Sequence, residues 1–194
     1  MLEAVQPIVL VGGASRRFGR DKLREPVGAG WLVDRPIAAL REVFGPRVAA
    51  VGDCGADVAA RADRHIADRY PGKGPLGGVV AAMEEFAADV FVLPGDVPAI
   101  TAQVVRAILC AAANDLSAWA VIAGADRPEP CIGIYRLAGL ETLKGRLVGR
   151  LALIDAIPGE RKTLVCVNPA VVVNANTPAD LRASYGAGGP STGR

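Results

Sequence analysis

The sequence predicts an α/β fold with a mostly parallel, Rossmann-like sheet flanked by helices in three layers. Three observations lead to this fold class. Strand and helix patterns alternate through the first two-thirds of the chain. The continuous apolar run at residues 90–93 is typical of a central parallel strand. The apolar run at residues 8–11 leads directly into a glycine-rich loop.

The expected strands are short apolar runs bounded by glycine, proline or aspartate. They lie at residues 8–11, 48–51, 65–67, 90–93, 119–123, 131–135, 164–167 and 171–173. Gly12, Gly52, Asp68 and Asp96 each follow one of the first four. If these strands are parallel, their four loops open at one edge of the sheet, where such folds bind ligands.

The expected helices follow the 3.6-residue apolar repeat. One begins near Asp34 and stops at Gly45, and Thr101 can cap another. The remaining helical stretches are residues 56–62, 76–86, 137–157 with breaks near the glycines at 145 and 149, and a last helix from about residue 178. Residues 23–30 have no regular pattern.

Length and composition narrow the class of protein. Residues 1–185 are expected to form one domain, and residues 186–194, rich in glycine, a disordered tail. With 51% hydrophobic but only 5% aromatic residues, the core must be mainly Ala, Val, Leu and Ile. A net charge of +2 is too small for a general nucleic-acid binder.

Compartment and metal content can also be predicted. The four cysteines lie far apart in the sequence, form no metal-ligand pair and indicate thiols in a reducing environment. The first residues do not form a signal peptide, and no run reaches the roughly 18 apolar residues that a membrane span needs. We therefore expect a cytoplasmic protein with no membrane partner.

The loop after residues 8–11 predicts a polyphosphate site. Gly12 and Gly13 let the backbone turn tightly against a ligand, and five cations follow between residues 16 and 24. The loop fits neither the dinucleotide fingerprint nor the P-loop, whose Gly-Lys must precede Ser or Thr. An ordinary strand-to-helix turn with a solvated basic face is the alternative.

This stretch resembles the signature of the molybdenum cofactor guanylyltransferases (MobA-like) and their cytidylyltransferase relatives, roughly Leu-Ala-Gly-Gly-x-Ser-x-Arg-Met-Gly-x-Asp-Lys. Val11 replaces the alanine and Phe18 the methionine. The resemblance covers roughly residues 5 to 184. It implies a Rossmann-like nucleotidyltransferase fold in which Lys22 and Arg17 neutralise the phosphates of a nucleoside triphosphate. The alternative for both cations is a solvated position at the surface.

Asp96 is the strongest single candidate for chemistry. It follows the most apolar strand and is held between Pro94-Gly95 and Val97-Pro98. A lone carboxylate opposite a polyphosphate loop suits Mg²⁺, which takes one or two carboxylates plus phosphate oxygens and waters. In the resembled family this position matches the Asp-x-Pro that binds Mg²⁺. The alternative is a residue that only caps a turn.

Two further segments resemble family motifs. Residues 68–78 match Asp-x-x-Pro-Gly-x-Gly-Pro-Leu-Ala-Gly, and residues 174–178 match Asn-x-Asn-Thr-Pro. Asp68 can accept a hydrogen bond from a ribose or base, or only form a turn, and Asn176 can bond phosphate or only cap a helix. The resemblance implies nucleotide or acceptor contacts at Leu10, Val11, Gly12, Gly13, Lys22, Asp68, Gly74, Gly78, Asn174 and Asn176.

Two positions depart from the family pattern. Glu129-Pro130 stands where the family often has His-Pro, and Gly52-Asp53 where it often has asparagine. A carboxylate at Glu129 is expected to repel a phosphorylated acceptor. His65, the only histidine, has no catalytic assignment; none is needed, because a phosphate monoester is already an anion at neutral pH.

The expected activity is transfer of GMP from GTP, with Mg²⁺, to the phosphate of molybdopterin bound to molybdenum, releasing pyrophosphate. The glycine loop at residues 74–78 favours GTP. One alternative is the corresponding cytidylyltransferase, which uses CTP. Another is a catalytically weak protein that holds nucleotide or cofactor and passes it to a cofactor-handling partner.

Overall fold

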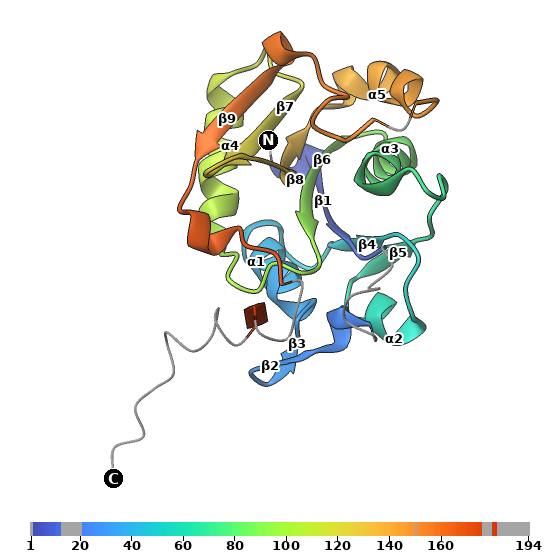
Figure 1. Ribbon diagram of the computed structural model, residues 1–194, viewed down its shortest axis with the longest axis vertical. Helices are drawn as coiled ribbons and strands as arrows, with labels where there is room; N and C mark the ends of the chain where they lie inside the picture. Colours follow the sequence, from blue (N-terminus) through green and yellow to red (C-terminus); the bar gives the residue numbers. More distant parts are fainter. Residues whose placement is uncertain (1, 13–20, 150, 176–179, 182–194) are drawn as a thin grey trace.

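The computed structural model describes residues 2–12, 21–149, 151–175 and 180–181. These residues form a seven-stranded sheet in the order β5-β4-β1-β6-β8-β7-β9 and a separate two-stranded hairpin, β2-β3 (Figure 1). All neighbouring pairs in the large sheet are parallel except those that involve β8. The α/β class with a mostly parallel sheet is therefore confirmed.

The strands follow the apolar runs of the sequence closely. They are β1 (Val5–Leu10), β2 (Pro26–Val27), β3 (Gly30–Trp31), β4 (Ala49–Val51), β5 (Arg64–Ile66), β6 (Asp89–Pro94), β7 (Ala120–Gly124), β8 (Pro128–Tyr135) and β9 (Lys162–Cys166). The middle of β6, residues 90–93, is completely buried, as its unbroken apolar run predicts. One of its neighbours, β8, is antiparallel because β7 and β8 are joined by a short turn.

Parallel pairing brings the expected loops to one edge of the sheet. β1 pairs with β4 on one side and β6 on the other, and β4 pairs with β5. Beyond the strand ends, the Gly95 N–H donates to the Leu10 carbonyl at 2.9 Å and the Gly52 N–H to the Ile66 carbonyl at 2.9 Å. The four loops expected to open together do so.

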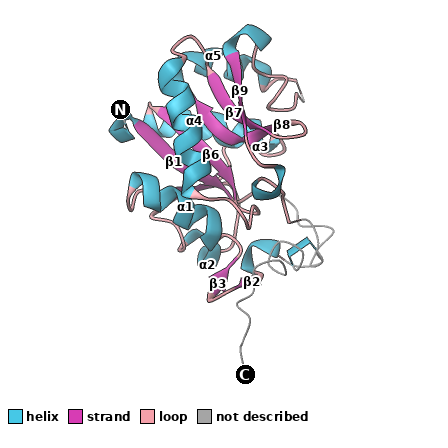
Figure 2. Cartoon of the chain, turned by 90° about the vertical axis from the view of Figure 1, so that its left-hand side faces the viewer, coloured by secondary structure: helices cyan, strands magenta, loops and turns pink. Residues whose placement is uncertain are grey.

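Helices cover both faces of the sheet, which makes the three layers. The larger helices are α1 (Asp34–Phe44), α3 (Gly74–Phe86), α4 (Ala102–Asn114) and α5 (Leu140–Arg146), and α2 (Ala56–Ala59) is a single turn. On one face of the sheet α1 packs on α4, and on the other face α3 packs on α5 (Figure 1). Figure 2 shows α1 and α4 lying over the strands of their face.

The core has the composition that the sequence predicts. Each face of the sheet has its own cluster of buried side chains, and Ala, Val, Leu and Ile supply most of both. Phe44 of α1 and Phe91 of β6 form an aromatic contact with ring centroids 5.8 Å apart. Tyr135 is completely buried.

Four predicted elements were wrong in part. Residues 137–157 hold the short η3 (Leu137–Gly139) and α5, and turns follow Arg146. Residues 171–173 do not form a strand: Asn168 accepts a hydrogen bond from the Ala170 N–H and starts the 3-10 turn η5 (Pro169–Val171). Residues 23–30, expected to be irregular, hold the end of η2 (Lys22–Arg24) and β2, and their last residue starts β3. Thr101 is at the N-cap, but its side chain makes no capping hydrogen bond.

Some predictions fall outside the described residues. The tail at 186–194 and the start of the last helix at residue 178 cannot be compared with the structure. Among the described helices, none is long and apolar enough to cross a membrane.

Gly52 gives a prediction about stability. Its φ is +120°, and a Cβ added there would lie 2.6 Å from the Gly12 backbone nitrogen, whereas Gly45, with φ +76°, has open space around it. Gly45→Ala should cost about 1–3 kcal/mol from backbone strain alone, because φ 76° with ψ −171° is a conformation essentially confined to glycine. Gly52→Ala should cost at least about 1 kcal/mol more, because overpacking adds to the strain.

Urea unfolding of both variants measures the difference. Equal midpoints for Gly45→Ala and Gly52→Ala would show that the close approach of the two loops contributes nothing.

Candidate active site

The site is centred on an ion pair between two strand-end loops. The Lys22 ammonium contacts the Asp96 carboxylate. The side chains are only 19% and 15% exposed, so the pair is largely shielded from solvent. Lys22 follows β1 and Asp96 follows β6, and 74 residues separate them in the chain. The two residues that the sequence singled out for opposite charges are therefore in direct contact.

Local structure explains how Lys22 reaches this position. The Asp21 side chain accepts a hydrogen bond from the Leu23 N–H at 3.1 Å and caps η2, which Lys22 begins. Leu23 is buried and packs over Gly95, where a Cβ would lie 2.9 Å from the leucine. A larger residue at position 95 would therefore have to displace the end of the Leu23 side chain.

The backbone of Ala175 joins both members of the ion pair. Its N–H donates to the Asp96 carbonyl at 2.8 Å, and its carbonyl accepts from Lys22 Nζ at 3.4 Å. Ala175 is completely buried. The sequence singled out its neighbours Asn174 and Asn176 but not Ala175 itself, since a backbone contact leaves no trace in residue type.

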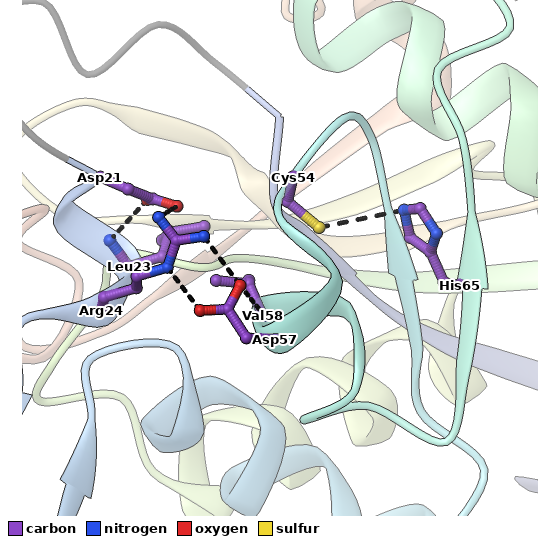
Figure 3. A network of polar contacts seen from close by, with 7 residues as sticks. All are labelled: Asp21, Leu23, Arg24, Cys54, Asp57, Val58 and His65. Carbon is purple, nitrogen blue, oxygen red and sulfur yellow. Dashed lines mark hydrogen bonds and ion pairs between the residues drawn. The ribbon is translucent and has the colours of Figure 1, made fainter.

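Arg24 fixes the same segment from the other side. Its guanidinium donates two hydrogen bonds to Asp57 at 2.8 and 2.7 Å and lies 3.3 Å from Asp21 (Figure 3). The hydrogen bonds from Arg24 hold the pKa of Asp57 down at about 2. Arg24 remains 41% exposed while it links η2 to α2. Sequence patterns could not reveal this pairing, because 33 residues separate the two partners.

The loops after β4 and β5 lie beside the loop that follows β1. The backbones of Gly12 and Gly52 approach closely, and the Asp53 carboxylate accepts from the Asp68 N–H at 3.1 Å. His65 Nε2 lies 2.9 Å from the Gly52 carbonyl and 3.9 Å from the Cys54 sulfur (Figure 3). Burial raises the pKa of Cys54, and the nearby carboxylates add to the shift, so this thiol stays protonated. These contacts position the loops.

The second glycine-rich loop has a mixed role. A Cβ at Gly78 would lie 2.8 Å from Leu10, and one at Gly77 would lie 2.9 Å from Tyr70, so both glycines permit packing inside the protein. Gly74, at the start of α3 with φ +59°, faces open space. Asp68 accepts a hydrogen bond from the Tyr70 N–H at 2.8 Å, the turn contact that was its alternative role.

The predicted site residues thus fall into four groups. Lys22, Asp96 and the backbone next to Asn174 come together, while Gly12, Asp68 and Gly74 lie on the loops of the β1, β4 and β5 side. Leu10 is partly buried and Val11 is buried, so their side chains serve the core. Gly13, Arg17 and Asn176 lie outside the described residues.

The groups around Asp96 decide whether Mg²⁺ fits there. In the described part of the chain, His, Cys, Asp and Glu side chains form no group of three that could hold a metal. Asp96 therefore does not belong to such a group, and the protein by itself supplies too few ligands there to enclose a metal ion. This fits Mg²⁺ bound together with a nucleotide, since such an ion takes its other ligands from phosphate oxygens and waters.

Comparison with solved structures finds the same fold in other proteins. Molybdopterin-guanine dinucleotide biosynthesis protein A from Archaeoglobus fulgidus superposes with a TM-score of 0.70 at 21% identity, covering 93% of this chain and 97% of that chain. The 4-diphosphocytidyl-2C-methyl-D-erythritol synthase of Anaerococcus prevotii gives a TM-score of 0.71 at 10% identity, covering 94% and 97%. At these identities the likeness shows the fold alone.

Sequence comparison identifies the family. The model of the MobA-like NTP transferase domain matches residues 7–157. The probable molybdenum cofactor guanylyltransferase of Opitutus terrae is 34% identical over 189 residues, 91% of this chain and 93% of that protein. The corresponding protein of Mycobacterium avium is 33% identical and covers 91% and 92%. The chain belongs to the MobA-like NTP transferase family and is a nucleotidyltransferase.

The link between Arg24 and Asp57 predicts a pH dependence. The pKa of Asp57 is lowered from 3.8 to about 2. Its ionisation therefore stabilises the folded state above the unfolded pKa, and this contribution disappears as the pH falls through about 2. Arg24→Ala should raise the pKa of Asp57 toward its ordinary value.

Carboxyl chemical shifts of Asp57, followed by NMR as the pH is lowered, measure this change. Arg106→Ala, which removes an exposed partner of Glu42, is the control and should leave Asp57 unchanged. An Asp57 titration that is the same with and without Arg24 would contradict the assignment.

Proposed function

We propose that this protein transfers GMP from GTP to the terminal phosphate of molybdopterin carrying molybdenum, with release of pyrophosphate. The observation that supports it most is the contact between Lys22 and Asp96 at the end of β1 and β6. A cation for phosphates and a carboxylate for a metal stand side by side there, in a chain whose relatives carry the name molybdenum cofactor guanylyltransferase.

Each residue has a defined task in this reaction. Lys22 leaves Asp96 and pairs with the phosphates of the bound triphosphate, while Asp96, with Lys22 withdrawn, can ligate Mg²⁺. Bound there, Mg²⁺ supplies positive charge against the charge that builds up on the phosphates and the departing pyrophosphate. The backbone of Ala175 keeps Asp96 in place during this exchange through its hydrogen bond of 2.8 Å.

The acceptor needs no general base. Its phosphate monoester is already an anion at neutral pH and can attack the α-phosphorus directly. Positioning and fixed positive charge therefore carry most of the catalysis. This agrees with a chain whose one histidine, His65, contacts the Gly52 carbonyl and is 3.9 Å from a thiol.

Pyrophosphate release identifies the nucleotide. The protein is mixed with Mg²⁺, molybdenum cofactor and either GTP or CTP, and pyrophosphate is measured. We expect release with GTP. Release with CTP alone would establish the cytidylyltransferase instead, and tight binding of nucleotide or cofactor without release would establish a carrier protein.

Removal of either charge of the central pair should abolish most of the activity. Asp96→Asn and Lys22→Met should each lower kcat by about 10²–10³-fold, as expected for a preorganised charged group that acts in the transition state. Glu141→Gln is the control, because Glu141 is 87% exposed on α5 and should keep full activity. Full activity in Asp96→Asn would remove Asp96 from the mechanism.

A further inference from the structure

A cavity of about 380 Å³ lies on the β8 side of the Lys22–Asp96 pair. It is formed by the turn between β7 and β8, residues 125–129, and by residues 169–174 after β9. Val172 and Val173 give it apolar surface, and Glu129 and Asn174 give it polar groups. Its volume lies within the range of about 300–1,000 Å³ that small-molecule sites occupy.

The cavity adjoins the ion pair of Lys22 and Asp96. Asn174, which lines it, directly precedes Ala175, whose backbone contacts both Asp96 and Lys22. Cys131 lies between the two regions: burial raises the pKa of its thiol to about 12, and the carboxylates of Asp96 and Glu129 add to the shift. The backbone at residues 174 and 175 therefore connects a wall of the cavity to the ion pair of Lys22 and Asp96.

The cavity is also separate from the loops that the sequence assigns to the nucleotide. Gly12, Asp68 and Gly74 lie over β1, β4 and β5, whereas the cavity lies over β7, β8 and β9 at the other end of the sheet. The central pair stands between the two regions. We therefore expect the cavity to bind the second substrate, the acceptor of the nucleotide.

Glu129 and Asn174 offer hydrogen-bond acceptors to the cavity, and Arg127 offers donors. The Glu129 side chain is 18% exposed and pairs with Arg127 Nε at 3.1 Å, while Arg127 is 80% exposed and free to turn toward solvent. Asn174 Oδ1 is buried and has no hydrogen-bond partner in the described structure. Buried acceptors are costly unless a donor reaches them. The ligand should therefore carry N–H donors.

We propose that Glu129 is the specificity-determining residue for the acceptor and binds the 2-amino-4-oxopyrimidine edge of its pterin ring; this rests on the proposed function. On that edge an amino N–H and a ring N–H point the same way. Two parallel donors match the two oxygens of a carboxylate, as in fork-like guanidinium pairs. Guanine has the same pair of donors, but in the proposed function it binds at the loops that carry Gly12, Asp68 and Gly74.

In this proposal Glu129 attracts the acceptor and does not repel it. The sequence led us to expect that its carboxylate would repel a phosphorylated acceptor. Arg127 compensates its charge in the structure. Glu129 contacts the ring end of the acceptor, and the phosphate of the acceptor lies at its other end. The carboxylate therefore selects the ring, while the acceptor phosphate points toward the triphosphate that Lys22 binds.

A pair of fluorescent ligands tests the proposal without any turnover. In 6-hydroxymethyllumazine a carbonyl replaces the 2-amino group of 6-hydroxymethylpterin, so that an acceptor faces Glu129 in place of a donor. Fluorescence titration at a pH where both rings are neutral should show that the wild-type protein prefers the pterin by about tenfold or more. Glu129→Gln should reduce this preference to about twofold or reverse it, because its amide also donates.

Asp126→Asn is the matched control, since it removes one carboxylate from the same cavity and should preserve the preference. Binding of neither ring, equal binding of both by the wild type, or an unchanged preference in Glu129→Gln would overturn the proposal. Equal losses in Glu129→Gln and Asp126→Asn would do the same, because they would reduce the effect to net charge.

The two proposals can fail separately. A preference for the pterin without pyrophosphate release would leave the Glu129 assignment intact and refute the transfer reaction. Pyrophosphate release together with a pterin preference that is unchanged in Glu129→Gln would support the transfer reaction and refute the Glu129 assignment. If Glu129→Gln raises KM for GTP and leaves KM for the acceptor unchanged, the cavity binds guanine and the assignment to the acceptor is wrong.

Discussion

The structure depends on the parallel pairing of β1 with both of its neighbours. β1 lies between β4 and β6, and the ladder continues beyond the strand ends through the hydrogen bond from Gly95 to Leu10. This pairing fixes where the loops after the three strands emerge. Because all three emerge at one edge, side chains from residues 22 and 96 can meet. The close approach of Gly12 and Gly52 is a consequence of the same pairing.

The ion pair at this edge combines a structural task with a chemical one. A carboxylate that is only 15% exposed is costly without a partner, and Lys22 supplies one. In the reaction that we propose, substrate binding exchanges the partners: the ammonium passes to phosphate and the carboxylate to metal. In that proposal neither charge is left uncompensated at either stage. The contacts around the pair, from Asp21, Arg24 and Ala175, hold its backbone while the charged ends change partners.

The sequence predicted the strands and the helices with a strong apolar pattern, and it singled out Lys22 and Asp96, which the structure places in contact. These features are local, since strand runs, glycine loops and a Pro-Gly-Asp turn are visible within a few residues. Three kinds of feature were out of reach. The contact of Ala175 is made by its backbone, the Arg24–Asp57 pair joins distant segments, and the cavity beside Glu129 depends on how residues 169–174 pack against a distant turn. The strand expected at 171–173 failed because Asn168 and Pro169 start a 3-10 turn.

The exchange of partners at Asp96 is the central claim, and a crystal structure with a non-hydrolysable GTP analogue and Mn²⁺ in place of Mg²⁺ tests it most directly. We expect the anomalous signal of Mn²⁺ at roughly 2.0–2.2 Å from an Asp96 carboxylate oxygen, close to the distance that Mg²⁺ adopts. Lys22 Nζ should have moved from Asp96 to a phosphate oxygen. A triphosphate bound with its metal elsewhere, while Lys22 and Asp96 remain paired, would contradict the account.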